Sequence, residues 1–114
     1  MFEGRNGFKP TLPIVGLLKR FVVSEDSMRP ALEPGDGLVA IRSTRLRRGQ
    51  IRCFEHPAQP GFWLVKRVGH VRGDRFEAIS DNAAADTVDS RRFGDVSVDG
   101  SFRVVVRVPR RRRR

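Results

Sequence analysis

Hydrophobic and polar positions alternate along the chain in short runs, which glycine- and proline-rich turns separate. Runs of this kind, rich in β-branched and aromatic residues, predict short strands. The predicted strands cover residues 20–23, 37–41, 50–55, 62–68, 75–79 and 102–108. Pro30, Pro34 and Gly35 exclude regular structure between the first two. Because the pattern contains no long helix, it predicts an all-β domain built as a small folded sheet or barrel.

The segments outside these strands predict turns, one irregular stretch and two extensions. Turns are predicted at residues 56–61 and 71–74, and residues 80–95 are polar and irregular. A chain of 114 residues has the length of one domain. We therefore divide it into an N-terminal arm (1–20), a β domain (21–109) and a basic tail (110–114).

The charge of the chain indicates attraction to acidic surfaces. There are 23 Lys and Arg against 13 Asp and Glu, a formal net charge of +10. The single Cys53 cannot form an internal disulfide, and its strand context predicts a buried structural thiol. Residues 12–23 form too short an apolar run to span a membrane, and basic residues interrupt it. We therefore expect a cytoplasmic protein whose arginine tail can make weak contact with anionic lipid or nucleic acid.

A serine nucleophile needs a base, and the sequence offers two kinds. His56 lies in a proline-flanked turn and His70 follows a glycine, so both are expected at the surface. Lys66 lies in the apolar run 62–68, where burial would lower its pKa. Moving that pKa from about 10.4 to near 7 requires roughly 4–5 kcal/mol. Spacing alone leaves open whether Lys66 faces the core or the solvent.

Four short motifs follow one another in a recognisable order. They are Ser27-Met28-Arg29-Pro30-Ala31-Leu32 with Gly35-Asp36; Arg48-Gly49-Gln50-Ile51; Lys66-Arg67-Val68 with Gly73-Asp74; and Ser80-Asp81-Asn82 with Asp89-Ser90-Arg91 and Phe93-Gly94. In this order they resemble the boxes of the signal peptidase I superfamily. The resemblance covers residues 22 to 108 and implies the β fold of signal peptidase and LexA catalytic domains.

The resemblance implies a serine endopeptidase with Ser27 as nucleophile and Lys66 as general base. It further implies that Arg67 pairs with Asp81 and that the hydroxyl of Thr87 orients the lysine amine. The other supporting residues that it singles out are Met28, packed over the lysine, Pro30, which stiffens the turn, and the structural charges Asp89 and Arg91.

Three positions depart from the family pattern. Glu25 stands where many members supply a serine hydroxyl to the oxyanion hole, and an ionised carboxylate cannot donate. Loss of one such donor costs about 10²–10³ in rate. Ser80 replaces a glycine and Gln50 replaces an aspartate. These departures predict slow turnover or a specialised substrate.

Among the branches of the superfamily, the chain is most similar to the nickel-type superoxide dismutase maturation proteases. This similarity implies removal of a leader or N-terminal extension from a protein substrate. One alternative is a self-cleaving LexA-type regulator, although residues 1–26 contain neither Ala-Gly nor Cys-Gly. A second is a non-enzymatic basic β-barrel that binds nucleic acid. Metal-ligand spacings and phosphate-binding glycine motifs are lacking, so we expect no cofactor.

Overall fold

The computed structural model of the chain describes residues 17–85 and 88–110. The described residues form seven strands and one four-residue helix. Their bounds are β1 (Leu18–Val22), β2 (Gly37–Arg42), β3 (Ile51–Glu55), β4 (Trp63–Arg72), β5 (Arg75–Ile79), α1 (Ser90–Phe93), β6 (Val96–Ser97) and β7 (Phe102–Val108). The predicted all-β class is confirmed.

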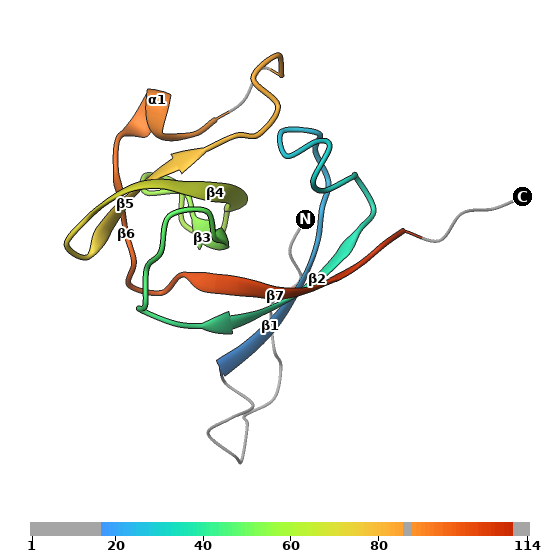
Figure 1. Cartoon of the computed structure of the whole chain (residues 1–114), viewed down its shortest axis with the longest axis horizontal. Helices are drawn as coiled ribbons and strands as arrows, with labels where there is room; N and C mark the ends of the chain where they lie inside the picture. Colours follow the sequence, from blue (N-terminus) through green and yellow to red (C-terminus); the bar gives the residue numbers. More distant parts are fainter. Residues whose placement is uncertain (1–16, 86–87, 111–114) are drawn as a thin grey trace, which may run out of the picture.

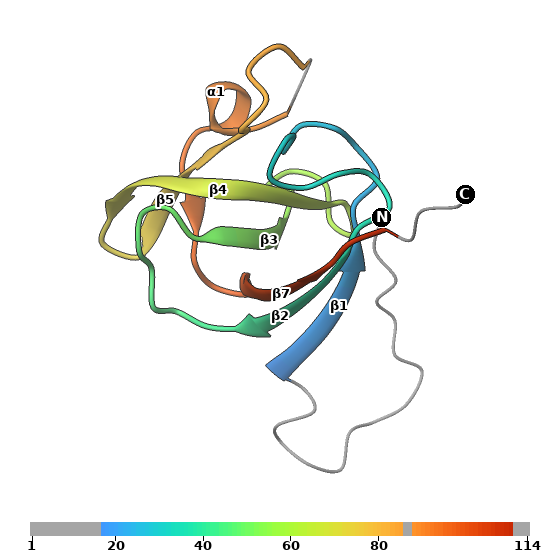
Figure 2. The ribbon, with the colours of Figure 1, turned by 45° about the vertical axis from the view of Figure 1, so that its right-hand side comes forward.

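The strands form one antiparallel sheet in the order β1-β2-β7-β3-β4-β5-β6. The last strand in the sequence, β7, therefore lies between β2 and β3 and joins the β1–β2 hairpin to the remaining strands. We call residues 23–36, which connect β1 and β2, the serine loop. Figures 1 and 2 both place this loop, in blue to cyan, at the same end of the molecule as the segment that follows β5.

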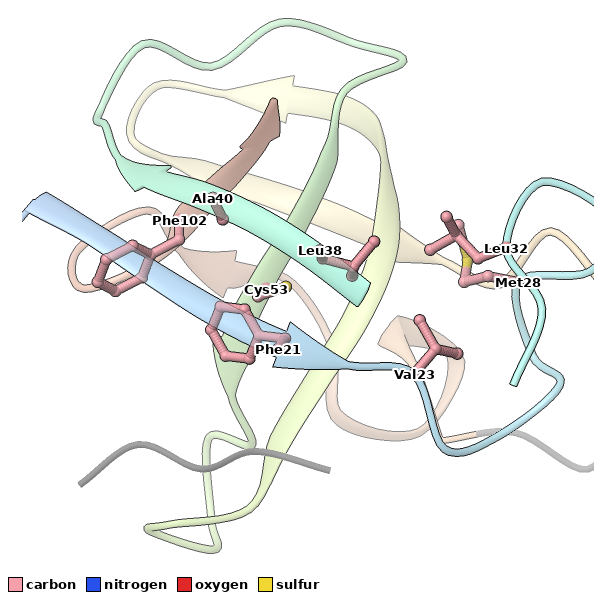
Figure 3. Close-up of a cluster of buried hydrophobic side chains, with 8 residues drawn as sticks. All are labelled: Phe21, Val23, Met28, Leu32, Leu38, Ala40, Cys53 and Phe102. Carbon is pink, nitrogen blue, oxygen red and sulfur yellow. The ribbon is translucent and has the colours of Figure 1, made fainter. Parts of the chain in front are cut away.

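Two hydrophobic clusters form the core of the domain. The first contains residues from β1, β2, the serine loop, β3 and β7: Phe21, Val23, Met28, Leu32, Leu38, Ala40, Cys53 and Phe102 (Figure 3). The second lies between β3, β4, β5 and β6 and contains Phe54, Leu64, Val68, Phe76, Ala78 and Val96. Strand β3 contributes to both, since Cys53 and Phe54 are buried on opposite faces. The buried thiol of Cys53 agrees with its predicted structural role.

The predicted turn at residues 71–74 is wrong in extent. Strand β4 continues to Arg72, and only Gly73 and Asp74 form the turn to β5. Gly73 has a φ of 63°, which a two-residue hairpin turn favours and which glycine adopts without strain. A register shift between Val68 and Val71 accommodates the longer strand. The predicted irregular stretch 80–95 also contains α1, which is too short to produce a helical period.

The ends of the domain differ in detail from the predicted division. Strand β1 begins at Leu18, within the segment assigned to the arm, while residues 1–16 lie outside the described residues. Arg110, assigned to the tail, donates its backbone N–H to Asp36 Oδ1 over 2.9 Å. Residues 111–114 also lie outside the part of the chain that the structure describes.

Candidate active site

The carboxylate of Asp36 anchors the end of the serine loop to β7. Its Oδ2 accepts hydrogen bonds from Glu33 N and Arg107 Nε, both over 2.8 Å. Burial alone would raise the pKa of Asp36, but hydrogen bonds from Glu33, Arg110 and Arg107 outweigh burial and lower it. Val23 N closes the loop by donating to Asp36 O over 2.9 Å. Strand β7 thus holds the loop at its base.

Ser27 and Met28 are buried in the turn of the serine loop. Ser27 is 4% exposed, and Met28 packs with Leu32 in the first hydrophobic cluster (Figure 3). Leu32 N donates to Met28 O over 2.9 Å, which closes the turn, and Pro30 is exposed within it. The sulfur of Met28 accepts a hydrogen bond of 3.5 Å from Asp81 N. Met28 therefore packs the loop against the segment that follows β5.

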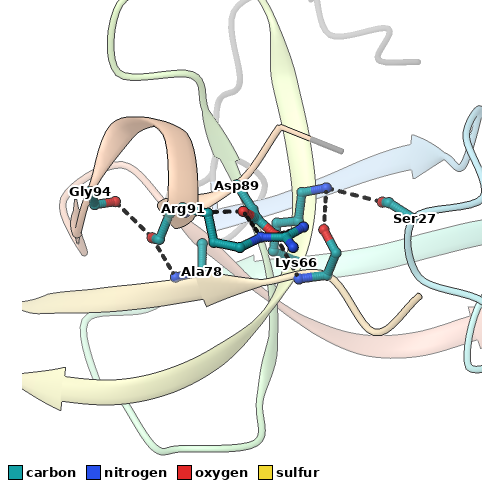
Figure 4. A network of polar contacts seen from close by, with 8 residues as sticks. Ser27, Lys66, Ala78, Asp89, Arg91 and Gly94 are labelled. Carbon is teal, nitrogen blue, oxygen red and sulfur yellow. Dashed lines mark hydrogen bonds and ion pairs between the residues drawn. The ribbon is translucent and has the colours of Figure 1, made fainter. Parts of the chain in front are cut away.

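Strand β4 brings Lys66 to the serine. Leu64, Lys66 and Val68 alternate with less buried residues, so the lysine lies on the core face of the strand and is 1% exposed. Its Nζ is 3.0 Å from Ser27 Oγ and 3.0 Å from Ser80 Oγ (Figure 4). The amine is thus within hydrogen-bond distance of one hydroxyl from the serine loop and one from the end of β5.

Burial lowers the pKa of the Lys66 amine below its ordinary value of 10.5. The negative charges of Asp89 and Glu25 act in the opposite direction, whereas the positive charge of Arg91 adds to the lowering. Burial is the largest of these effects. The environment therefore favours the neutral amine, which is the form that can accept a proton.

Residues 80–82 contact three parts of the site in succession. Ser80 Oγ accepts from Lys66 Nζ, and the Asp81 carboxylate accepts from Arg67. Asn82 N then donates to Ser27 O over 2.8 Å, and its Nδ2 donates to Asp26 O over 3.0 Å. This tripeptide therefore fixes the position of the lysine relative to the serine loop.

Two pairs of opposite charge flank the site: Arg67 with Asp81, as the resemblance implies, and Arg91 with Asp89, which it singled out only as structural charges. Arg67 Nε and Nη2 donate to the two oxygens of Asp81, each over 2.8 Å, and Arg91 Nε lies 3.1 Å from Asp89 Oδ1. Asp89 is buried, and burial alone would raise its pKa. Hydrogen bonds from Arg91 and Ser80 outweigh burial and lower the pKa of Asp89 to about 2. At neutral pH an ionised Asp89 therefore accepts the backbone N–H of Ser80 (Figure 4).

Sequence reasoning placed the lysine-orienting hydroxyl at Thr87, which lies outside the described residues. It missed Ser80, because the family pattern has a glycine there. It also gave no role to Asn82. The signal for Ser80 was its position: it is a hydroxyl residue directly after β5, the strand that pairs with the lysine-bearing strand β4. Neither His56 nor His70 is among the described residues that line the pocket at the serine.

A cavity of about 290 Å³ opens beside Ser27 and Lys66. Its walls come from the end of β1, the start of the serine loop, β2, β3 and the beginning of β4. They are largely apolar, with Phe21, Leu38 and Trp63 among the lining residues. Glu25 also lines the cavity, two residues before the serine. The cavity therefore gives an extended peptide chain access to Ser27 and Lys66.

An apolar cavity with a serine hydroxyl and a desolvated amine at its wall defines a candidate hydrolase of peptide-like substrates. The family model described as signal peptidase, peptidase S26, matches residues 11–84 of the chain. The chain therefore belongs to this family and is a signal peptidase-like serine endopeptidase that acts on protein substrates.

Three further findings are negative. No curated protein sequence matches the chain. Within residues 17–85 and 88–110, no helix is long and apolar enough to cross a membrane. The same described residues contain no group of three or more His, Cys, Asp or Glu side chains that could hold a metal ion.

Proposed function

We propose that the chain cleaves a leader or N-terminal extension from a protein substrate, with Ser27 as nucleophile and Lys66 as general base. The observation that carries this proposal is the buried amine of Lys66, 3.0 Å from Ser27 Oγ at the wall of the cavity. Hydrogen-bond reach and a lowered pKa are the two properties that a lysine base requires.

In the first half of the reaction, Lys66 accepts the proton of Ser27 as Oγ attacks the scissile carbonyl carbon. The resulting oxyanion needs hydrogen-bond donors, and the backbone N–H of Ser27 is the one we assign. The Lys66 ammonium then donates its proton to the departing amine, and the peptide bond breaks to leave an acyl-enzyme. Water completes the second half, with Lys66 again removing a proton. Ser80 and Asp89 keep the amine directed at the serine throughout.

The finer assignment, to the nickel-type superoxide dismutase maturation proteases, is also part of the proposal. The short interval of 39 residues between nucleophile and base supports it. A protein of this kind would work in the cytoplasm, where the precursor is made. A nickel-type superoxide dismutase precursor incubated with the chain should lose its N-terminal extension, as intact-mass spectrometry would show.

The test of the mechanism uses Ser27→Ala and Lys66→Met beside the wild-type chain. A diverse peptide library is incubated with each protein, and new termini are identified by mass spectrometry. We expect cleavage by the wild type alone, since each substitution removes one reacting group. Circular dichroism of the variants verifies that they remain folded. Cleavage at the same bonds by either folded variant would disprove the dyad.

A further inference from the structure

Glu25 places an unpaired negative charge on the wall of the active-site cavity. Among the described residues that line this cavity, only Glu25 and Lys66 carry ionisable acid or base side chains apart from the buried thiol of Cys53. Glu25 is exposed and forms no hydrogen bond or ion pair with another described residue. Asp36, Asp81 and Asp89, by contrast, each lie against an arginine. Glu25 is therefore available to a ligand in the cavity.

The remaining walls suit the aliphatic part of a long side chain. Val22, Phe62 and Val65 line the cavity with at least partly exposed side chains, while the lining residues Phe21 and Leu38 are buried. Arginine and lysine bury their methylene stems against apolar surfaces and direct the charged group to a polar partner. The apolar walls would contact the methylene stem of such a side chain, and the carboxylate of Glu25 would bind its charged group.

We propose that Glu25 selects protein substrates that carry an arginine or lysine side chain beside the scissile bond. The inference rests on the proposed function, because it assumes that Ser27 attacks a peptide held in this cavity. When Lys66 is neutral and acts as base, the described lining of the cavity carries one net negative charge, which is the carboxylate of Glu25. A cationic side chain is then the complementary ligand.

The same pairing removes an obstacle to catalysis. An unpaired carboxylate two residues from the nucleophile repels the oxyanion that develops on the substrate. A cation bound to Glu25 neutralises that charge during the reaction, whereas a neutral side chain leaves the repulsion in place. The preference should therefore appear in kcat as well as in KM. Glu25 acts here as a specificity residue and takes no part in bond making.

The formal charge of +10 does not argue for an acidic substrate at this position. Exposed charges more than about 10 Å apart are largely screened at physiological salt. Contact within the cavity is much closer, so the nearby carboxylate decides which side chain fits. The excess arginines lie outside the described lining of this cavity.

The first part of the experiment compares cleavage specificity. The wild type, Glu25→Gln and Asp26→Asn are incubated with the peptide library, and residues around each cleaved bond are counted. Asp26→Asn is the matched control, because it removes a negative charge next to Glu25 in the sequence from a residue that is not among those lining the cavity. We expect enrichment of arginine or lysine at one position for the wild type and Asp26→Asn, and loss of that enrichment in Glu25→Gln. Cleavage without such enrichment, or enrichment that survives Glu25→Gln, would overturn the inference and leave the proposed function standing.

The second part measures rates and binding with one matched pair of peptides. In the best library substrate, arginine is replaced by citrulline, which has nearly the same shape without the charge. The loss of a charge-assisted contact should lower wild-type kcat/KM by about 10- to 100-fold and have little effect in Glu25→Gln. Equal rates for the two peptides with wild type would refute selection by charge.

Binding separates failure of the inference from failure of the proposed function. Calorimetry with Ser27→Ala uses capped alanine-rich hexapeptides that contain one arginine or one citrulline. We expect tighter binding of the arginine peptide, with the difference absent when Glu25→Gln is added. If no library peptide is cleaved but this difference is present, the proposed chemistry fails while the cation site stands. Equal binding of the two hexapeptides overturns the cation site.

Discussion

Removal of the Ser80 hydroxyl tests the arrangement of the proposed base, Lys66, most directly. Ser80 Oγ lies 3.0 Å from Lys66 Nζ, and the Ser80 backbone N–H separately donates to Asp89 Oδ2 over 3.2 Å. Ser80→Ala removes the contact with Lys66 and the hydrogen bond from the Ser80 hydroxyl to Asp89, and leaves the backbone contact in place. The strand ends, the Arg67–Asp81 pair and the serine loop need not move, so the effect should fall on the orientation and pKa of the amine.

The magnitude follows from the loss of one buried hydrogen bond to an ionisable amine. Such a bond contributes about 1.5–3 kcal/mol, which corresponds to a fall of about 10- to 100-fold in kcat if the contact persists in the transition state. The hydroxyl also accepts from the ammonium form and so favours it. Its removal should lower the pKa of Lys66 further, by about one unit for each 1.4 kcal/mol. The acid limb of kcat/KM therefore moves to lower pH while the maximum falls.

The assay is hydrolysis of the best library peptide, with kcat and KM measured across the pH range. Ser80→Thr retains a hydroxyl and should recover most of the lost rate, and thermal unfolding shows whether each variant is folded. Thr87→Ala is the informative comparison, because the family resemblance gives the orienting role to that hydroxyl. Wild-type kcat and an unmoved acid limb in Ser80→Ala, together with a large loss in Thr87→Ala, would refute the reasoning.

Three further substitutions have effects that the contacts define. Lys66→Met should abolish cleavage yet raise the free energy of unfolding by about 1–2 kcal/mol, because it removes a buried amine whose charged form is disfavoured; urea unfolding measures this. Asp81→Asn should destabilise the fold by about 1–2 kcal/mol and lower kcat, since Arg67 loses its bidentate partner. Asp89→Asn should cost about 2 kcal/mol at pH 7, because the folded pKa is about 2 against an ordinary 3.8. The folded pKa is the lower one, so this difference should shrink as pH falls from 4 toward 2.

Each of these expectations has a control. Asp99→Asn removes one negative charge from an exposed turn and should change neither stability nor rate appreciably. A less stable Lys66→Met would mean that the amine contributes more through its hydrogen bonds than burial costs. An Asp89→Asn difference that stays constant from pH 7 to pH 2 would contradict the lowered pKa of Asp89.

The alternation of apolar and polar residues located six of the seven strands in the described residues. It predicted β5 and β7 with their observed bounds, since each stands between clear turn residues. It could not locate β6, which has two residues, or α1, which depends on the Asp89 cap. It also stopped β4 too early, because the register shift after Val68 interrupts the strand period without ending the strand.

The candidate site could be predicted only in part from the sequence. Proximity of Ser27 and Lys66 came from motif order, and spacing alone left the lysine free to face either side. The alternation of Leu64, Lys66 and Val68 within one strand was the local evidence for an inward lysine. The hydroxyl at Ser80 could not be predicted locally, because its role depends on which strand pairs with β4.

The contacts of residues 80–82 have a consequence for how the protein loses function. One three-residue segment restrains the lysine amine, the Arg67 side chain and the backbone of the serine loop, and it lies just beyond the last paired residues of β5. Local opening at a strand end needs less free energy than global unfolding. Thermal inactivation should therefore precede melting of the sheet, so a catalytically silent chain can still be folded. An insertion within this tripeptide would produce that state permanently.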